Sequence, residues 1–483
     1  MSKSPKKPTL IHTALTLGIF LLIACSFTTV FALPVVLAIF CGWFLMIGLG
    51  MYLGYDYHDL EEGAAFGIFE GMPALLILFA VGAMIGSWIV GGIVPGLIHY
   101  GLKMIHPQLF LPATLLLCSI TALATGTSWG AAGTAGVAMM GVGDGLGINP
   151  ALTAGAVLSG VYFGDKLSPL SDSVLLASSM SGVEIRSHIK AMLPISLSAF
   201  LITTIMFTLV GINTHQNSPP EQVMLITMAL EDHFTITPLI FIPPALVMLL
   251  LTMRVPAFPA ITFGAVLGVP YAVLLQDNNV NMAITSLWNT PLTDSGNLFI
   301  DQLLNRGGMF SILPSVAMII FGLGFGSLLV KVGIVQLLAD YLQKYITNES
   351  RLTNCTLLTA FLGNLLGSAM YVSLILTPKL LAETSDALKA DRRLLSRNTE
   401  FGGTLTSGMV PWSDNGTFMA GILGVSTLSY LPYMWLSFTC LIIAIATSWI
   451  RTLKGKSTQF LGDSALHHLQ SNPLLRKKRG KAD

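Results

Sequence analysis

Hydrophobic positions form long runs that recur from one end of the chain to the other. Three of these runs are Thr9–Phe31, Leu33–Leu53 and Tyr430–Ile450. A run of about 18 or more apolar residues is long enough to cross a bilayer as a helix. The first run is too long for a signal peptide and lacks a small-residue cleavage site. The pattern therefore predicts an all-α integral membrane protein that crosses the bilayer many times.

Composition supports this class and excludes others. The chain is 53% hydrophobic and only 10% charged, whereas soluble domains carry about 25% charged residues. It has no G-x-x-x-x-G-K-[ST] loop, so we do not expect it to hydrolyse ATP. The five cysteines lack metal-ligand spacing and suit small buried side chains. We expect no cofactor and no nucleic-acid partner, and we leave open whether two copies form a homodimer.

Cationic residues set the predicted orientation, because short cytoplasmic loops are rich in Lys and Arg. Lys3, Lys6 and Lys7 lie at the N-terminus, and 476–479 is a basic cluster in the tail. We therefore place both termini in the cytoplasm, which requires an even number of crossings. Two polar loops without cations, near Asn213–Phe234 and Gln276–Asp301, are placed outside. About ten crossings and two hairpins fit, and twelve full crossings satisfy the same parity.

The alternation of inside and outside loops fails at Leu352–Thr377. This apolar stretch lies between Arg351 and the cationic segment Lys379–Arg397, which both favour the cytoplasmic side. A segment that begins and ends on one side is re-entrant, and Gly363-Asn364 and Gly367-Ser368 are suitable helix breakers. Non-helical backbone at membrane depth persists only inside protein or beside a wet cavity. Transporters place their binding sites at such breaks.

The sequence also repeats weakly with an offset of about 240 residues. Gly160–Ser173 matches Gly402–Asn415, and both segments contain Pro-x-Ser-Asp. A Gly-x-x-x-Gly-Ser motif at 82–87 recurs at 322–327, although such motifs can also reflect generic helix packing. An aspartate in the membrane is costly, so its repetition carries more information.

Charge indicates that the two repeats are inverted. The loop after Asp172 carries Arg186 and Lys190, whereas the loop after Asp414 has no cation. We therefore predict two inverted-topology repeats with re-entrant hairpins and broken helices. The predicted parts are a first repeat with its N-terminal cytoplasmic segment (1–211), an external connecting loop (212–237), a second repeat (238–450) and a basic cytoplasmic tail (451–483).

Two polar clusters within these repeats carry the candidate chemistry. Thr125–Gly136 is rich in glycine and hydroxyl residues, and we predict that it forms the tip of the first hairpin. A proline in each Pro-x-Ser-Asp turn frees a backbone carbonyl, and oxygen atoms are the ligands of hard cations. The candidate ion- and proton-binding residues are Asp172, Asp414, Asp165, Ser171, Ser173, Ser168, Thr125, Thr127, Ser128, Asn364, Ser368, Thr406, Ser407, Ser413 and Asn415.

Carboxylates suit an antiporter because two cations can compete for them. Removal from water favours the protonated acid, whereas a bound cation favours the carboxylate. We predict Na⁺ sites at Asp172 and Asp414. The alternative for both is helix capping beside the proline, and Asp165 could instead pair with Lys166. Glu70 is either a residue through which protons reach the site or an interfacial carboxylate.

At these motifs the chain resembles the NhaC family of sodium/proton antiporters. The resemblance rests on "VGAMIGSWIVGGIVPGLIHYGL", "TGTSWGAAGTAGVAMMGVGDGLGI", "SGVYFGDKLSPLSDS" and "LSRNTEFGGTLTSGMVPWSDNGTFMAGILGV". It implies Na⁺/H⁺ exchange across the bacterial cytoplasmic membrane, and a broader transporter group with inverted repeats that often moves by an elevator mechanism. Some relatives exchange malate for lactate with sodium. The segment "SDSVLLASS" departs from the family, whose members often have Thr-Thr-Asn after the Asp.

Three other functions compete with Na⁺/H⁺ exchange. "GTSWG" fits a serine-nucleophile pattern, but the histidines lie mostly in predicted loops and supply no base; "GVGD" resembles an aspartyl protease motif but falls in a polar turn. We therefore do not expect an enzyme. A channel would conduct without counter-flow. An exchanger of small organic acids would bind a carboxylate at the hairpin tips, helped by Lys166 or Arg397.

Overall fold

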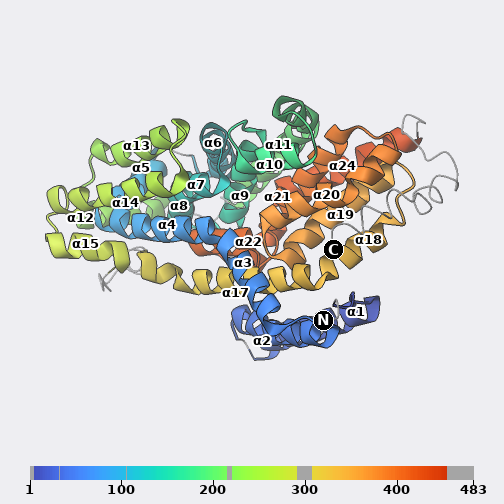
Figure 1. Ribbon diagram of the computed structural model, residues 1–483. Helices are drawn as coiled ribbons and strands as arrows, with labels where there is room; N and C mark the ends of the chain where they lie inside the picture. Colours follow the sequence, from blue (N-terminus) through green and yellow to red (C-terminus); the bar gives the residue numbers. More distant parts are fainter. Residues whose placement is uncertain (1–4, 32, 105, 215–219, 291–306, 454–483) are drawn as a thin grey trace.

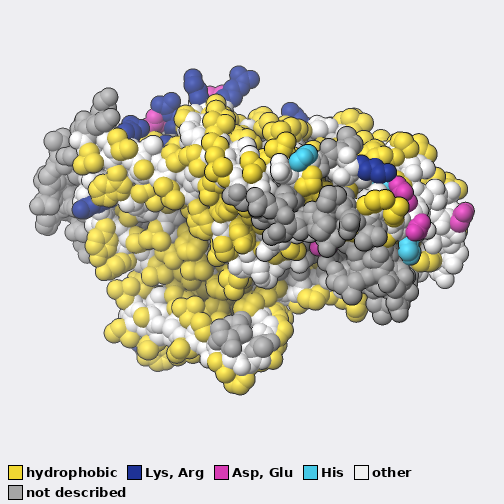
Figure 2. Space-filling view, turned by 180° about the vertical axis from the view of Figure 1, so that it is seen from behind, with side chains coloured by type: hydrophobic (Ala, Val, Ile, Leu, Met, Phe, Trp, Pro, Cys, Tyr) yellow, Lys and Arg dark blue, Asp and Glu magenta, His cyan; other side chains and the backbone are white. Residues whose placement is uncertain are grey.

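The computed structural model describes residues 5–31, 33–104, 106–214, 220–290 and 307–453, and its elements are helices (Figure 1). In these ranges seven helices are long and apolar enough to cross a membrane, or eight if the bent pair Ile226–His233 and Pro238–Thr252 is one span. Hydrophobic side chains cover much of the surface (Figure 2). The prediction of an all-helical, multi-pass membrane protein is confirmed. The seven are Val35–Leu53, Met72–Val90, Pro107–Thr125, Ile185–Ile212, Ala257–Leu274, Met309–Val332 and Trp435–Leu453.

Two series of helices follow the same order: a long helix, a short helix, a hairpin, a broken helix and a long closing helix. The first series is α4 (Met72–Val90), α5 (Ile93–Met104), the hairpin α6 (Phe110–Thr125) with α7 (Ser128–Ala131) and α8 (Val137–Gly145), the broken helix α9 (Pro150–Leu167) with α10 (Asp172–Met180), and α11 (Ile185–Thr214). The second is α17 (Leu313–Val332), α18 (Ile334–Gln343), the hairpin α19 (Glu349–Gly367) with α20 (Met370–Ala387), the broken helix α21 (Arg392–Ser407) with α22 (Asp414–Leu423), then α23 (Thr427–Tyr430) and α24 (Trp435–Leu453).

The remaining helices pack on the opposite series. The helices α1 (Leu10–Cys25), α2 (Val35–Leu53) and α3 (Tyr57–Glu70) share an apolar cluster with α17, and α1 and α2 project below α17 in Figure 1. The helices α14 (Ala257–Leu274) and α15 (Val280–Trp288) pack on α4, with α13 (Ile242–Thr252) beside α14 and α12 (Pro220–His233) on α5. Each long helix, α4 and α17, is therefore flanked by helices from the other half of the chain.

The two broken helices run antiparallel through the centre. Along α21 and α22, Ser396 donates to the Ala177 carbonyl, Glu400 accepts from Ser173, and Asn415 accepts from the Tyr162 hydroxyl. Residue numbers rise along one helix as they fall along the other. This arrangement is the one expected of two inverted repeats.

The repeat alignment has a packing counterpart at its glycines. A Cβ at Gly160 would lie 2.5 Å from the Leu115 carbonyl oxygen of α6, and one at Gly402 would lie 2.7 Å from the Leu357 carbonyl oxygen of α19. Each broken helix thus lies against the first helix of its own hairpin at a matching glycine. Small residues permit this close approach of two backbones.

Several predicted loops are helical instead. Most of Lys379–Arg397 continues α20 or begins α21, because Leu381, Leu388 and Leu395 are buried in one apolar cluster. The helix α12 fills 220–233 within the predicted external connection, and α15 lies in the second polar loop, whose residues 291–301 lie outside the described ranges. The first hairpin turns at Gly126-Thr127 alone, and 128–136 is helical with a π-helical turn at 132–136.

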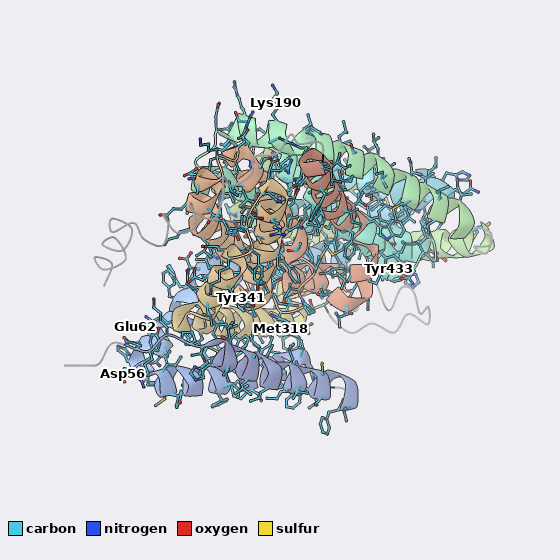
Figure 3. All side chains as sticks on the ribbon, turned by 90° about the vertical axis from the view of Figure 1, so that its right-hand side faces the viewer. Asp56, Glu62, Lys190, Met318, Tyr341 and Tyr433 are labelled. Carbon is cyan, nitrogen blue, oxygen red and sulfur yellow. The ribbon has the colours of Figure 1, made fainter. Side chains whose placement is uncertain are left out.

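Acidic residues lie exposed at the start of α3. Asp56 caps α3, and Glu62 lies on its second turn; both are exposed and lie close together beside α2 (Figure 3). Lys190 lies at the opposite edge of the molecule in this view. The predicted domain boundaries at 211, 237 and 450 stay predictions.

Candidate ion-binding site

Each hairpin tip lies against the break of the broken helix in its own series. In the first series the Ser168 hydroxyl donates to the Leu123 carbonyl at 2.9 Å, and the backbone of Leu170 contacts Gly126. In the second series the Asp414 N–H donates to the Ser368 carbonyl at 2.8 Å. Gly126 and Ser368 both have positive φ, 68° and 56°, which turns the chain sharply. The predicted breaker at Gly367-Ser368 is confirmed, whereas Gly363-Asn364 lies within α19.

Serines cap the helices that follow the breaks. The Ser171 hydroxyl accepts from the Val174 N–H at 3.5 Å, and the Ser413 hydroxyl accepts from the Gly416 N–H at 2.9 Å. Asp172 and Asp414 are the first residues inside α10 and α22. The alternative in which the two aspartates cap these helices is therefore wrong, because the preceding serines take that role.

Asp414 is 2% exposed, between the second hairpin tip and the second break. Its Oδ1 accepts from the Asn415 N–H at 2.6 Å and from the Met370 N–H at 3.2 Å. In the second hairpin tip, Asn364 Oδ1 in the last turn of α19 and Ser368 Oγ just after α19 are buried without a partner among the described residues. Buried oxygens are normally paired, so this tip offers oxygen atoms that a cation could use.

The other residues of the second cluster bond to one another. The Ser413 hydroxyl donates to the Ser407 carbonyl at 2.6 Å, and the Ser407 hydroxyl accepts from the Asn415 amide at 2.6 Å. The Asn415 oxygen accepts from the Trp129 indole at 3.0 Å, which links the second break to the first hairpin. Thr406 donates to the Gly402 carbonyl and accepts from the Asn364 amide. These bonds fix the shape of the site, and direct ion contacts of these side chains stay predictions.

In the first cluster, Asp165 is the buried carboxylate. It is 4% exposed, lies beside the hydroxyls of Ser128 and Ser171, and has one oxygen without a partner in the described chain. Lys166 points elsewhere: its ammonium lies 3.2 Å from Cys440 Sγ and 5.0 Å from the centre of the Phe401 ring. The alternative of an Asp165–Lys166 ion pair is wrong, since neighbouring residues on a helix face different directions.

The remaining residues of this cluster differ in burial. Asp172 is exposed, unlike Asp414. Thr125 is buried and donates to the Thr121 carbonyl at 2.9 Å, and Thr127 caps α7 by accepting from the Gly130 N–H at 3.3 Å. The two predicted Na⁺ aspartates thus occupy equivalent positions in the repeat but have different surroundings.

A large open cavity of about 1600 Å³ connects the two clusters. Residues of both hairpin tips and both breaks line it, including Ser128, Asp165, Asp172 and Asp414. Glu70 lies exposed in its wall on α3. The cations of the lining are Arg254 and Lys331, not the predicted Lys166 and Arg397. Lys166 is fully buried behind the cavity because its side chain packs on Phe401.

Sequence reasoning missed Glu400 in α21. This residue is fully buried and accepts from the Ser173 hydroxyl at 2.8 Å, so it joins the two repeats. The signal was present in "RNTEFGG", where an acidic residue lies in a helix next to the polar break. Burying a carboxylate at such a position costs free energy, and this cost alone makes the residue a candidate for a functional role.

Comparison with known proteins identifies the family of this chain. A model of the Na⁺/H⁺ antiporter family matches residues 160–450. The chain is 34% identical to the Na⁺/H⁺ antiporter NhaC of Alkalihalophilus pseudofirmus over 93% of this chain and 98% of that protein. The chain belongs to the NhaC family of Na⁺/H⁺ antiporters.

Proteins similar to this chain differ in the substrates that their names give. The chain is 51% identical to the malate-2H⁺/Na⁺-lactate antiporter of Bacillus subtilis, over 92% of this chain and 95% of that relative. It is 31% identical to the arginine/ornithine antiporter ArcD of Halobacterium salinarum, over 83% and 84%. A model of the C4-dicarboxylate anaerobic carrier also matches residues 1–213. The protein is therefore a sodium-coupled membrane antiporter. The names of several proteins similar to it include organic substrates.

Proposed function

We propose that this protein exchanges Na⁺ for H⁺ by competition at buried carboxylates, with Asp414 as the principal Na⁺ ligand and Asp172 at the equivalent turn. The observation that carries the proposal is the Asp414 pocket. Its carboxylate is buried at a helix break, and unpaired oxygens of Asn364 and Ser368 lie in the same hairpin tip.

Burial makes the competition obligatory. An isolated carboxylate removed from water is costly, and it is stabilised either by a proton or by a bound cation. One negative charge cannot be neutralised fully by both at once. Release of Na⁺ to one side therefore favours uptake of a proton, and the next half-cycle reverses the exchange. No cofactor is needed.

The alternating access that this requires is assigned to the hairpins and broken helices as one mobile unit. The hydrogen bonds between the breaks and the tips, such as Asp414 to Ser368, support movement of these elements together. The basic segments at both ends favour cytoplasmic termini in a bacterial cytoplasmic membrane. Lys and Arg side chains gather along the upper left edge in Figure 2, which is compatible with such a charge asymmetry.

Everted membrane vesicles test this proposal. With a pH gradient already formed, added Na⁺ should dissipate the gradient in vesicles that contain the protein. K⁺ at the same concentration serves as the control for ionic strength, and vesicles without the protein control for leakage. Dissipation that is equal for Na⁺ and K⁺ would contradict the proposal. Flux of Na⁺ without any proton counter-flow would instead indicate a channel.

A second candidate is exchange of small organic acids coupled to Na⁺ and H⁺. The cavity of about 1600 Å³ is far larger than a bare cation requires, and Arg254 and Lys331 lie in its wall. Guanidinium and ammonium groups are suited to binding carboxylates. The 51% identity to the malate/lactate exchanger and the match to the dicarboxylate carrier favour a substrate of this class.

Substrate addition separates the two candidates. Malate or lactate should increase Na⁺-dependent proton movement if the acid is carried, and should leave it unchanged if only cations are exchanged. Arg254→Gln should then raise the half-saturation concentration for the acid by about tenfold. This factor corresponds to the loss of one charged contact worth about 1.5 kcal/mol. Lys344→Gln, which removes a cation outside the cavity lining, is the matched control.

A further inference from the structure

Glu400 is a buried carboxylate to which the proposed Na⁺/H⁺ competition assigns no role. It lies in the middle of α21 and is fully buried, and its Oε1 accepts the Ser173 hydroxyl at 2.8 Å. Its Oε2 has no hydrogen-bond partner among the described residues. A charged group at this depth is expensive to keep without compensation. The presence of a carboxylate at this buried position is therefore not explained by helix packing alone.

Two serine hydroxyls connect Glu400 to the cavity. Ser171 Oγ and Ser173 Oγ lie 3.1 Å apart, and Ser173 then bonds to Glu400. Both serines line the cavity, whereas Glu400 does not. The hydroxyls thus form a continuous hydrogen-bonded path from the cavity to a carboxylate behind its wall.

This path suits a proton better than a sodium ion. A hydroxyl can accept one proton while passing on its own, so cavity water can protonate Ser171 as Ser171 passes its proton to Ser173, and Ser173 passes its proton to Glu400. One proton enters, and each serine keeps one. A metal ion cannot be relayed from hydroxyl to hydroxyl. It would need an open passage and several oxygen ligands at each position along it. In the described part of the chain, the side-chain oxygens beside Glu400 are those of Ser173, which donates to it, and Thr404.

The charges around Glu400 also fit a single proton. Asp165 and Lys166 of α9 are the charged groups that interact with it. Two carboxylates and one ammonium carry a net charge of −1, and one bound proton makes the buried group neutral. Nearby titratable side chains are the Cys440 thiol of α24, beside Lys166, and His188 of α11, which is bonded to Ser396 one turn before Glu400. Asp172 and Tyr371 lie on the cavity side, near Asp165.

We infer that Glu400 is a proton-carrying site separate from the Na⁺ site at Asp414, and that the Ser171–Ser173 pair delivers its proton. This inference rests on the proposed Na⁺/H⁺ exchange and deepens it. Na⁺ and H⁺ then meet different carboxylates, one at the second hairpin tip and one between the repeats. Exchange then requires that the broken helices carry Na⁺ at Asp414 on one stroke and a proton at Glu400 on the other, so the competition acts between two buried carboxylates that move together.

Glu400→Gln in proteoliposomes tests the inference with two readouts. The amide oxygen of Gln can still accept from Ser173, so the tie between the repeats is kept. Exchange of ²²Na⁺ for Na⁺, which needs no net proton movement, should persist. Dissipation of a pH gradient by Na⁺ should fall by at least about tenfold, a typical size for the coupling between two linked ligands, and the Na⁺ flux should lose its pH dependence.

The other outcomes overturn the inference in distinguishable ways. Loss of both readouts would make Glu400 a Na⁺ ligand or a folding requirement, and no change in either would make it a structural tie. Absence of both activities in the unmodified protein would instead refute the proposed function itself. Ser173→Ala should slow the pH-gradient response without shifting the half-saturation concentration for Na⁺. Ser178→Ala is the control, since the hydroxyl of this buried serine of α10 donates to the Leu175 carbonyl of its own helix and to no other group in the described residues.

Discussion

The two Pro-x-Ser-Asp turns are equivalent in sequence but not in their surroundings. Asp414 is buried under a hairpin tip and accepts two backbone N–H groups, whereas Asp172 is exposed toward the cavity. The match of the two motifs predicted their positions at the helix breaks correctly. It could not predict their different burial, because burial depends on the partner segment, and the two hairpins have different sequences at their tips.

We predict that Asp414→Asn abolishes Na⁺-driven exchange while the protein still folds. The amide oxygen of Asn can keep the contacts to Met370 and Asn415, so only the charge is lost. Losing a charged ligand costs at least about 1.5 kcal/mol, or about tenfold in Na⁺ affinity. The measurement is Na⁺-dependent pH-gradient dissipation in vesicles. Asp340→Asn, an exposed residue bonded to Gln336 on α18, should leave the response unchanged. Unimpaired exchange in Asp414→Asn would remove this residue from the site.

At the scale of helices, the hairpins and breaks were predictable and their exact bounds were not. The second hairpin followed from the cations on both sides of Leu352–Thr377, a physical constraint on which side of the bilayer each end lies. The cations of Lys379–Arg397 predict a loop, but the segment is mostly helical because Leu381 and Leu395 are buried in an apolar cluster. The sequence pattern does not single out Glu400, because this residue lies inside a regular helix and not in a proline turn.

The long helix α17 holds the second hairpin tip through a glycine. A Cβ at Gly326 would lie 2.3 Å from the Gly367 carbonyl oxygen. The neighbour is backbone, so it cannot move aside by changing rotamer as a side chain could. This contact lies one residue before Ser368, and therefore sets the position of the proposed Na⁺ ligands.

We predict that Gly326→Ala displaces the hairpin tip, lowers the stability of the protein by about 1–3 kcal/mol, as overpacking does, and weakens Na⁺-dependent exchange. Thermal unfolding in detergent and the vesicle assay measure the two effects. Gly48→Ala in α2 is the matched control, since no atom lies within 4 Å of its Cβ position, and alanine should be neutral or stabilise the helix by about 0.5–1 kcal/mol. Equal behaviour of the two variants would argue against tight packing at α17.

For the whole molecule, the helices form two groups. The long helices α4 and α17 and the helices that flank them form a framework, and the hairpins and broken helices form a central unit. The long helices α4 and α17 are flanked by α14 and by α2, whereas the hairpins and broken helices bond to one another across the repeats. If the central unit moves relative to the framework, α22 must slide along α17. A Cβ at Gly421 of α22 would lie 3.1 Å from Cβ of Ser315 on α17, which makes this contact a place to stop the movement.

We predict that a disulfide between Gly421→Cys and Ser315→Cys, in a background without the native cysteines, blocks exchange reversibly. Disulfides hold Cβ atoms about 3.5–4.5 Å apart, so a small local adjustment permits the bond. The control pair Gly363→Cys and Ser373→Cys has a similar separation of 3.0 Å but lies within the second hairpin. Oxidation of the control pair should leave exchange intact because both residues move together, and reduction of the first pair should restore exchange. If exchange continues with the α17–α22 bond closed, the central unit does not slide along α17, and alternating access must come from movement within the hairpins themselves.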